Sequence, residues 1–370
     1  MDKILVTGGA GFIGSHLVDR LVELGKDIVA LDNFDPQVHQ GKRPDYLNPN
    51  ARYIEGDVRD EKVLKKALEN VGIIFHLAAK VGVAQSMYEI KEYVSANTFG
   101  TAFLWDYIIN RRLGVKKFIV ASSMSIYGEG LYACAKCGQA APYLRSGRDL
   151  EMKRWEIPCP ECAEDLKPIP TSEDKKLLPT SIYAITKKDQ EEISLNLGTS
   201  YKIPTVALRF FNVYGPRQSL SNPYTGACAI FSSRVKNDRA PLIYEDGNQR
   251  RDFINVKDIV SSCVLAMNSE KCDYNFFNVG TGRAVSIKEA AGIIINLYAK
   301  DLTPKITKSF RVGDIRHCYA DIAKFKEIGF STKIKLEDGL KSLVEWSSRA
   351  QATDNLEKAD LELERRRLKI

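Results

Sequence analysis

Near its amino terminus the chain reads Ile4-Leu5-Val6-Thr7-Gly8-Gly9-Ala10-Gly11-Phe12-Ile13-Gly14. The apolar run predicts a buried strand, and the apolar periodicity from Ile13 to Leu24 predicts a helix. Gly8, Gly11 and Gly14 fall in the turn between them, where glycine permits tight folding and lets a phosphate approach free backbone amides. The stretch predicts a strand–turn–helix unit that binds a dinucleotide, with a plain turn as the alternative.

The same alternation of strand and helix continues along the chain. Strands are predicted over 4–7, 27–32, 52–56, 73–78, 117–122 and 205–211, and helices over 13–24, 61–70, 93–110 and 181–197. Alternating elements of this kind predict an α/β fold with a Rossmann-type, doubly wound parallel sheet.

The 370 residues are enough for two domains and an insert. We expect a Rossmann domain from 1–128 and 173–211, an insert over 129–172, and a mainly substrate-binding, smaller α/β domain over 212–350. The charged tail, 351–370, is expected to be a solvated helix or a disordered end rather than a partner-binding helix.

Composition excludes several classes of partner. The formal net charge of +7 suits an anionic small molecule and is well below what nucleic-acid binding requires. No run of 18 apolar residues occurs, and the chain starts without a charged leader and cleavage site. We therefore expect a cytoplasmic protein with no membrane or nucleic-acid partner.

Two acidic residues follow predicted strands. Asp32 ends the second strand, where a carboxylate can accept hydrogen bonds from both adenosine ribose hydroxyls and repel a 2′-phosphate. This favours NAD over NADP, although Asp32 could be only a turn residue. Asp57 could reach the adenine amino group or cap the helix that begins at Glu61.

Tyr183 and Lys187 are four residues apart and therefore lie on one helix face, one turn from each other. A lysine cation favours a phenolate and lowers a tyrosine pKa toward the working pH. Tyr183 could then remove a proton from a sugar hydroxyl. The spacing alone is also common on surface helices.

Taken together, the glycine turn, Asp32, Ser122-Ser123 at the end of a strand, and the Tyr183/Lys187 pair resemble the extended short-chain dehydrogenase/reductases. Within them the chain is similar to the NAD-dependent nucleotide-sugar epimerases and dehydratases over about residues 1–350, the insert excepted. The resemblance implies that Ser123 hydrogen-bonds the reacting hydroxyl. The cofactor contacts it implies are Gly8, Gly11, Phe12, Ile13, Gly14, Asp32, Asn33, Asp57, Val58, Leu77, Ala78, Ala79, Asn97, Tyr183 and Lys187. A lysine that often follows the fourth strand is replaced by Val81.

Further segments match the nucleotide-sugar site of that family. In Arg209-Phe210-Phe211-Asn212-Val213-Tyr214-Gly215-Pro216, the resemblance implies that Asn212 contacts the nucleotide sugar. Arg251 and Arg311 resemble the pair that clamps the diphosphate, a role suited to a guanidinium. Asp314 is expected to accept from the nucleotide ribose, and Ser123, Met124 and Ser125 are expected to contact the sugar.

Met124-Ser125 occupies the place where the family's 4,6-dehydratases carry Asp-Glu, so elimination lacks its acid and base. Hydride removal and return at C4 remain, which implies a 4-epimerase. Stretches such as Gln85-Ser86-Met87-Tyr88-Glu89-Ile90 look most like the dTDP-L-rhamnose 4-epimerase type. UDP-glucose or UDP-glucuronate epimerisation, a net NAD-dependent oxidoreductase and a catalytically silent NAD-binding interaction protein remain open.

Two C-x2-C pairs, Cys134/Cys137 and Cys159/Cys162, lie in the insert with 21 residues between them. Four thiolates so arranged predict a closed structural zinc site, and iron is possible in the same shell. The insert's six basic and seven acidic residues argue against a nucleic-acid ribbon.

The insert leaves and re-enters the chain between Ser123 and Tyr183. We therefore predict a flap over the sugar site, with Tyr143, Arg145, Arg148 and Trp155 as candidate substrate-facing residues. The family resemblance also implies a homodimer formed through the helices at 93–110 and 181–197.

Overall fold

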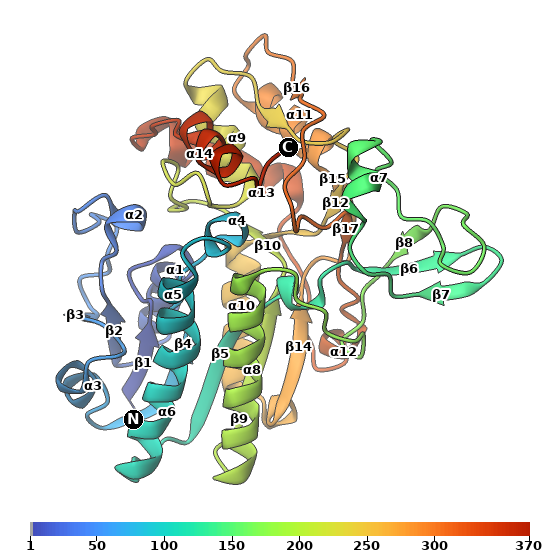
Figure 1. The fold of residues 1–370 in the computed structure, drawn as a ribbon. Helices are drawn as coiled ribbons and strands as arrows, with labels where there is room; N and C mark the ends of the chain where they lie inside the picture. The colour runs from blue at the N-terminus through green and yellow to red at the C-terminus, as the bar shows by residue number, and fades with distance from the viewer. Residues whose placement is uncertain (1–2) are drawn as a thin grey trace.

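The structure, a computed structural model, describes residues 3–370. Its centre is a seven-stranded parallel sheet in the order β14-β9-β5-β4-β1-β2-β3 (Figure 1). The strands are β1 (Lys3–Thr7), β2 (Ile28–Asp32), β3 (Arg52–Glu55), β4 (Val71–His76), β5 (Lys117–Ser123), β9 (Thr205–Phe210) and β14 (Asn275–Val279). The strand order reverses between β1 and β4, which opens a crevice at the carboxyl ends of the strands. The predicted doubly wound sheet is confirmed.

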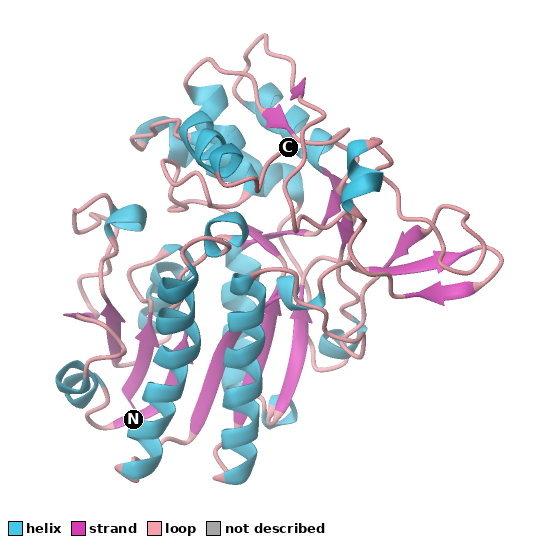
Figure 2. Cartoon of the chain, viewed as in Figure 1, coloured by secondary structure: helices cyan, strands magenta, loops and turns pink. Residues whose placement is uncertain are grey.

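Helices cover both faces of this sheet (Figure 2). Ile4 and Val6 pack toward α1 and α10, whereas Leu5, between them, packs with Trp105 of α6. The alternation follows from the period-two geometry of a strand buried on both sides. The helices that pack on the sheet or connect its strands are α1 (Phe12–Glu23), α2 (Pro36–His39), α3 (Glu61–Ala67), α4 (Val83–Ser86), α5 (Ile90–Tyr93), the π-helical η1 (Val94–Phe99), α6 (Gly100–Asn110), η2 (Met124–Tyr127), α8 (Ile182–Ser200), α10 (Val256–Asn268), η3 (Glu270–Cys272) and α12 (Ala323–Lys326).

A smaller lobe lies beyond the carboxyl ends of the strands (Figure 1). Its apolar core includes Phe231, Ile294 and Leu340, one from each of three helices. The lobe's elements are α9 (Ala227–Lys236), α11 (Ile287–Leu297), α13 (Leu336–Arg349), α14 (Leu356–Arg365), β10 (Asn212–Tyr214), β11 (Leu242–Ile243), β12 (Arg250–Arg251), β13 (Phe253–Asn255), β15 (Val285–Ser286), β16 (Lys305–Ile306) and β17 (His317–Cys318). The interval 212–350, expected to be mainly this lobe, also supplies α10, β14 and α12 to the large domain.

The insert is a small antiparallel sheet, β7-β6-β8, that projects to one side of the molecule (Figure 1). Its elements are β6 (Leu131–Cys134), β7 (Gly138–Ala140), α7 (Gly147–Glu151) and β8 (Lys167–Ile169). Tyr132, Ile157 and Leu166 form its apolar cluster together with Cys134 and Cys159. The apolar core of the insert is therefore much smaller than that of either larger unit.

The expectation of a solvated or disordered tail is wrong. The tail does form a helix, α14, but Leu356, Ala359 and Leu363 are buried against the smaller lobe. Across residues 3–370, no helix combines the length and apolar character needed to cross a membrane.

Candidate active site

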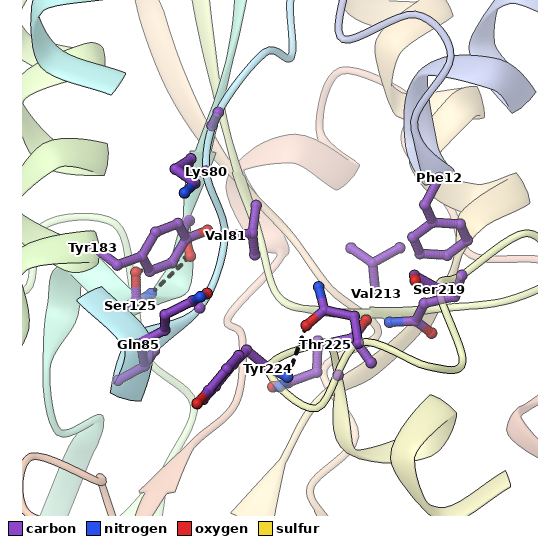
Figure 3. Close-up of a pocket in the computed structure, with 18 of the residues that line it drawn as sticks. Phe12, Lys80, Val81, Gln85, Ser125, Tyr183, Val213, Ser219, Tyr224 and Thr225 are labelled. Carbon is purple, nitrogen blue, oxygen red and sulfur yellow. Dashed lines mark hydrogen bonds between the residues drawn. The ribbon is translucent and has the colours of Figure 1, made fainter. Parts of the chain in front are cut away.

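A cavity of about 620 Å³ lies between the sheet and the smaller lobe. Its walls come from the turns after β1, β2, β4 and β5, from the start of α8, and from the lobe's segments 210–231, 242–253 and 311–315. Figure 3 shows Tyr183, Gln85 and Ser125 on one side of the cavity and Phe12, Val213 and Ser219 on the other.

The glycine turn forms one end of the cavity. Gly8 has φ +70°, a conformation that favours glycine, and a Cβ there would lie 3.0 Å from the amide nitrogen of Ala78. A Cβ on Gly14 would lie only 2.0 Å from the Gly8 carbonyl oxygen. Gly11 stands immediately before α1, and it has no side chain to hydrogen-bond the first backbone amides of the helix. These amides therefore face the cavity and can bind an anion. Phe12 and Ile13 also line this end.

Asp32 and Asp57 both border the cavity. The Asp32 carboxylate accepts hydrogen bonds from the Ala10 and Phe34 amides, both at 2.9 Å, which fixes it at the end of β2. Asp57 does not cap a helix; Asp60 caps α3. Burial opposes ionisation of Asp57, yet hydrogen bonds from Arg59 outweigh it and lower the pKa of that carboxyl. The cavity wall also includes Asn33, Val58, Leu77, Ala78 and Ala79.

Asn97 is not in the cavity wall, contrary to its expected cofactor contact. It is fully buried in the π-helical η1, where its Oδ1 accepts from the Lys80 amide at 2.7 Å and its Nδ2 donates to Thr186 at 2.9 Å. Asn97 therefore ties the loop after β4, which carries Lys80, to α8, which carries Tyr183.

Ser123, Tyr183 and Lys187 all line the cavity. The Ser123 hydroxyl accepts a hydrogen bond from the Ser125 hydroxyl at 3.0 Å. Burial raises the pKa of the Tyr183 phenol, and the nearby Ser123 side chain opposes this only in part. The three predicted catalytic groups therefore share one cavity.

Lys187 does not act on Tyr183 in the way the spacing predicted. Its Nζ donates to Gln190 on the same helix at 2.7 Å, and the side chain is 4 % exposed. Burial lowers the pKa of Lys187 to about 7, with the Glu191 charge opposing this. In this structure the pKa of Tyr183 is raised by burial and not lowered by Lys187 as predicted.

The predicted substrate contacts also border the cavity. Met124, Ser125, Asn212, Arg251, Arg311 and Asp314 all line the cavity. The Arg311 Nε donates to Asp314 at 2.9 Å, while Arg251 donates to the carbonyl oxygens of Ile315 and Arg316. Within residues 3–370 the buried Oδ1 of Asn212 has no hydrogen-bond partner, so it is free to accept from a ligand.

Sequence reasoning missed several groups in the wall. Lys80 lines the cavity one residue before Val81, and its Nζ bonds Glu89 at 3.2 Å. Two buried amide oxygens, Oε1 of Gln218 and of Gln249, lack partners among the described residues. Gln85, Tyr224 and Tyr244 also contribute. Isolated glutamines and tyrosines carry no spacing signal, so only the tertiary structure could find them.

The insert carries its own cluster. The sulfur atoms of Cys134, Cys137, Cys159 and Cys162 lie within 4.8 Å of one another, and none of these cysteines is in a disulfide. Backbone amides of Cys137 and Lys136 lower the pKa of the Cys134 thiol. The donor set and its spacing fit a tetrahedral tetrathiolate metal site.

The insert is not a flap over the sugar site. None of its described residues, 129–172, lines the cavity, and Tyr143 is 72 % exposed. Arg145 is instead buried in a bidentate ion pair with Glu245, at 2.8 and 2.9 Å, and Glu156 pairs with Arg316 and His317. Because Glu245 lines the cavity, the insert supports the wall from behind.

Comparisons with known proteins agree with this architecture. The chain matches the family described as "NAD dependent epimerase/dehydratase family" over residues 4–151 and 156–280. It is 35 % identical to the dTDP-L-rhamnose 4-epimerase of Burkholderia thailandensis, over 93 % of this chain and 94 % of that one.

Solved structures are similar along almost their whole length. UDP-glucose 4-epimerase from Thermotoga maritima, solved with UDP-glucose, has a TM-score of 0.77 and 32 % identity, covering 93 % of this chain and 98 % of that one. UDP-glucuronic acid 4-epimerase from Bacillus cereus, solved with UDP-glucuronic acid and NAD, has a TM-score of 0.76 and 28 % identity over the same shares.

Proposed function

This chain belongs to the NAD dependent epimerase/dehydratase family, and from that membership we propose that it is an NAD-dependent nucleotide-sugar 4-epimerase. The observation that carries the proposal is one cavity whose lining includes the glycine turn, Asp32, Ser123 and Tyr183, together with Arg311 and Asp314. The enzyme is thus an isomerase.

The residues present fit NAD. Only glycine can occupy the Gly8 and Gly14 positions without a clash, and the open amides at the start of α1 suit a pyrophosphate. Asp32 favours a free ribose 2′-hydroxyl over a phosphate. NAD, when bound, supplies a reversible hydride acceptor for C4 of the sugar.

Tyr183 moves the proton. As a phenolate it takes the C4 hydroxyl proton, and after the keto sugar has turned over it returns that proton to the oxygen. Ser123 orients the same oxygen by hydrogen bonding. Lys187, whose pKa is lowered to about 7, donates a hydrogen bond to Gln190 on the helix that also carries Tyr183.

Dehydration is disfavoured at this site. Met124 is 8 % exposed and packs in the main apolar core while bordering the cavity, and a thioether donates no proton. Ser125 is hydrogen-bonded to Ser123, and no basic side chain among residues 3–370 hydrogen-bonds it. Hydride removal and return at one carbon is the chemistry that remains.

The substrate is a nucleoside-diphosphate sugar, and dTDP-L-rhamnose is our first candidate because of the relative at 35 % identity. UDP-glucose and UDP-glucuronate are the alternatives, after the two similar structures. Arg251 and Arg311 would bind the diphosphate, Asp314 the ribose and Asn212 the sugar nucleotide.

Two further features complete the proposal. The four insert cysteines hold a structural zinc ion, since a tetrathiolate shell leaves no open position for catalysis. The chain forms a homodimer through η1, α6 and α8, a surface on which Val94, Phe99 and Ile185 are 41 %, 52 % and 42 % exposed. Exposed apolar side chains grouped on adjoining helices favour burial against a second copy.

The test is proton NMR of the purified protein with a panel of nucleotide sugars, dTDP-L-rhamnose included, with catalytic NAD and no reductant. Conversion of one sugar to its C4 epimer without accumulation of NADH supports the proposal. NADH appearing in step with a keto product would favour a net oxidoreductase. No reaction with any sugar, together with a Tyr183→Phe variant that behaves in the same way as the unmodified protein, would favour a catalytically silent NAD-binding protein.

A further inference from the structure

The last residues of the chain return to the substrate wall. After α14, Leu368 and Ile370 pair with the segment that carries Arg311: the Phe310 amide donates to Ile370 at 2.9 Å, the Ile370 amide donates back at 3.0 Å, and the Val312 amide donates to Leu368 at 2.9 Å. Figure 1 shows α14 beside α9, above the carboxyl ends of the sheet strands. The tail thus forms a short antiparallel bridge with the loop expected to bind diphosphate.

A buried carboxylate in α14 links the tail to the cavity wall. Asp360 is 6 % exposed and accepts hydrogen bonds from the Tyr244 hydroxyl and from the Lys369 ammonium. The Arg311 guanidinium lies over the Tyr244 ring, 4.7 Å from its centre. Tyr244 and Arg311 both line the cavity, so Asp360 fixes the ring on which Arg311 rests.

The tail also reaches two other parts of the cleft. Leu356 lines the cavity, and Asn355 donates to the Ser221 carbonyl at 2.9 Å. The Arg366 guanidinium lies 4.2 Å from the ring centre of Tyr88, a residue of the large domain. The Tyr88 hydroxyl in turn bonds that of Tyr224, 2.6 Å away, in the cavity wall. The tail therefore contacts both sides of the cleft.

We propose that residues 351–370 form a strap that completes the nucleotide end of the substrate site, with Asp360 as the positioning residue that holds Tyr244 and Arg311 for the diphosphate. The proposal rests on the proposed function for the identity of the ligand. A tail with only a stabilising role would leave substrate binding unchanged once the protein is folded. The strap makes the opposite prediction.

The probe is the nucleoside diphosphates UDP and dTDP, titrated calorimetrically into the full-length, NAD-loaded protein. Asp360→Ala should weaken binding of the preferred diphosphate at least tenfold and leave NAD affinity within twofold of the unmodified protein. Lys358→Ala, at an exposed position on the same helix, is the matched control and should change neither value. In turnover, the strap predicts a raised KM with kcat little changed.

Tyr244→Phe is a second variant that tests the same link if Asp360→Ala fails to fold. It removes only the hydroxyl that donates to Asp360, should weaken diphosphate binding in the same direction, and should add little to Asp360→Ala in the double variant. Equal diphosphate affinity in Asp360→Ala, Tyr244→Phe and the unmodified protein would overturn the strap while leaving the proposed function intact. If the unmodified protein binds neither diphosphate, the proposed substrate class fails and the strap fails with it.

Discussion

Alanine in place of Gly14 should disrupt the cofactor turn. The new Cβ would lie 2.0 Å from the Gly8 carbonyl oxygen and 2.9 Å from the Gly8 carbonyl carbon and the Gly9 Cα, whereas ordinary contacts begin at 3.4 Å. These neighbours are backbone atoms that cannot rotate away, so α1 must shift against the turn. Overpacking of this kind costs about 1–3 kcal/mol of unfolding free energy.

Alanine in place of Gly11 separates cofactor binding from folding. Its Cβ meets one atom, the Gly8 carbonyl oxygen at 3.3 Å, and its φ of −69° is open to any residue. We expect the unfolding free energy to stay within about 0.5 kcal/mol of the unmodified protein. The added methyl group nevertheless stands beside the helix amides that face the cavity, so NAD should bind at least about tenfold more weakly, or about 1.4 kcal/mol.

Urea unfolding and calorimetric titration with NAD measure the two effects separately. Gly14→Ala should lower both stability and NAD affinity, and Gly11→Ala should lower NAD affinity alone. Gly11→Ala protein that binds NAD as tightly as the unmodified protein would refute the assignment of this turn to the pyrophosphate.

Three further outcomes follow from the insert and from the buried lysine. Arg145→Met removes one of the two arginines that pair with the buried Glu245 carboxylate, Arg316 being the other, and should cost about 1–3 kcal/mol of unfolding free energy in a urea titration. Lys136→Met, at an exposed pair with Glu164, should cost less than about 1 kcal/mol. Removing metal with a chelator should speed amide hydrogen exchange across 131–169 and leave exchange in β1 unchanged; no change in either segment would count against a metal in the insert. Because burial lowers the pKa of Lys187 to about 7, the unfolded chain binds a proton that the folded chain lacks between about pH 7 and 10, so Lys187 makes stability rise with pH there by up to about 1.4 kcal/mol per unit. Lys187→Met should flatten that rise in paired urea titrations, and identical pH slopes would show that the ammonium is not desolvated.

Local sequence signals were enough for the sheet and for the residues that line the end of the cavity formed by the glycine turn. Strand and helix periodicity is a property of short windows, and the glycine turn, Asp32 and Ser123 all follow directly from the ends of predicted strands. These parts were predicted because their geometry is set by neighbours in the chain.

The errors arose where distant segments meet. Arg145 was expected to face the substrate, but its partner Glu245 is a hundred residues away and draws the insert onto the outside of the lobe. The tail was expected in solvent because its leucines keep no heptad, yet Leu368 and Ile370 hydrogen-bond residues 310–312 in a short antiparallel bridge. Lys187 was given a role from its spacing to Tyr183, while burial lowers the pKa of its ammonium and its Nζ donates to Gln190.

The most direct measurement of the central claim uses a substrate that carries deuterium at C4. Mass spectrometry of the epimer formed in ordinary water, with Tyr183→Phe as the inactive control, follows the label through the reaction. Transfer of hydride away from C4 and back predicts that the product keeps its deuterium at C4. In the converse experiment, with the unlabelled sugar in D2O, it predicts that the product takes up no deuterium at C4. Loss of the label to water, or turnover by the Tyr183→Phe protein at the unmodified rate, would contradict the account.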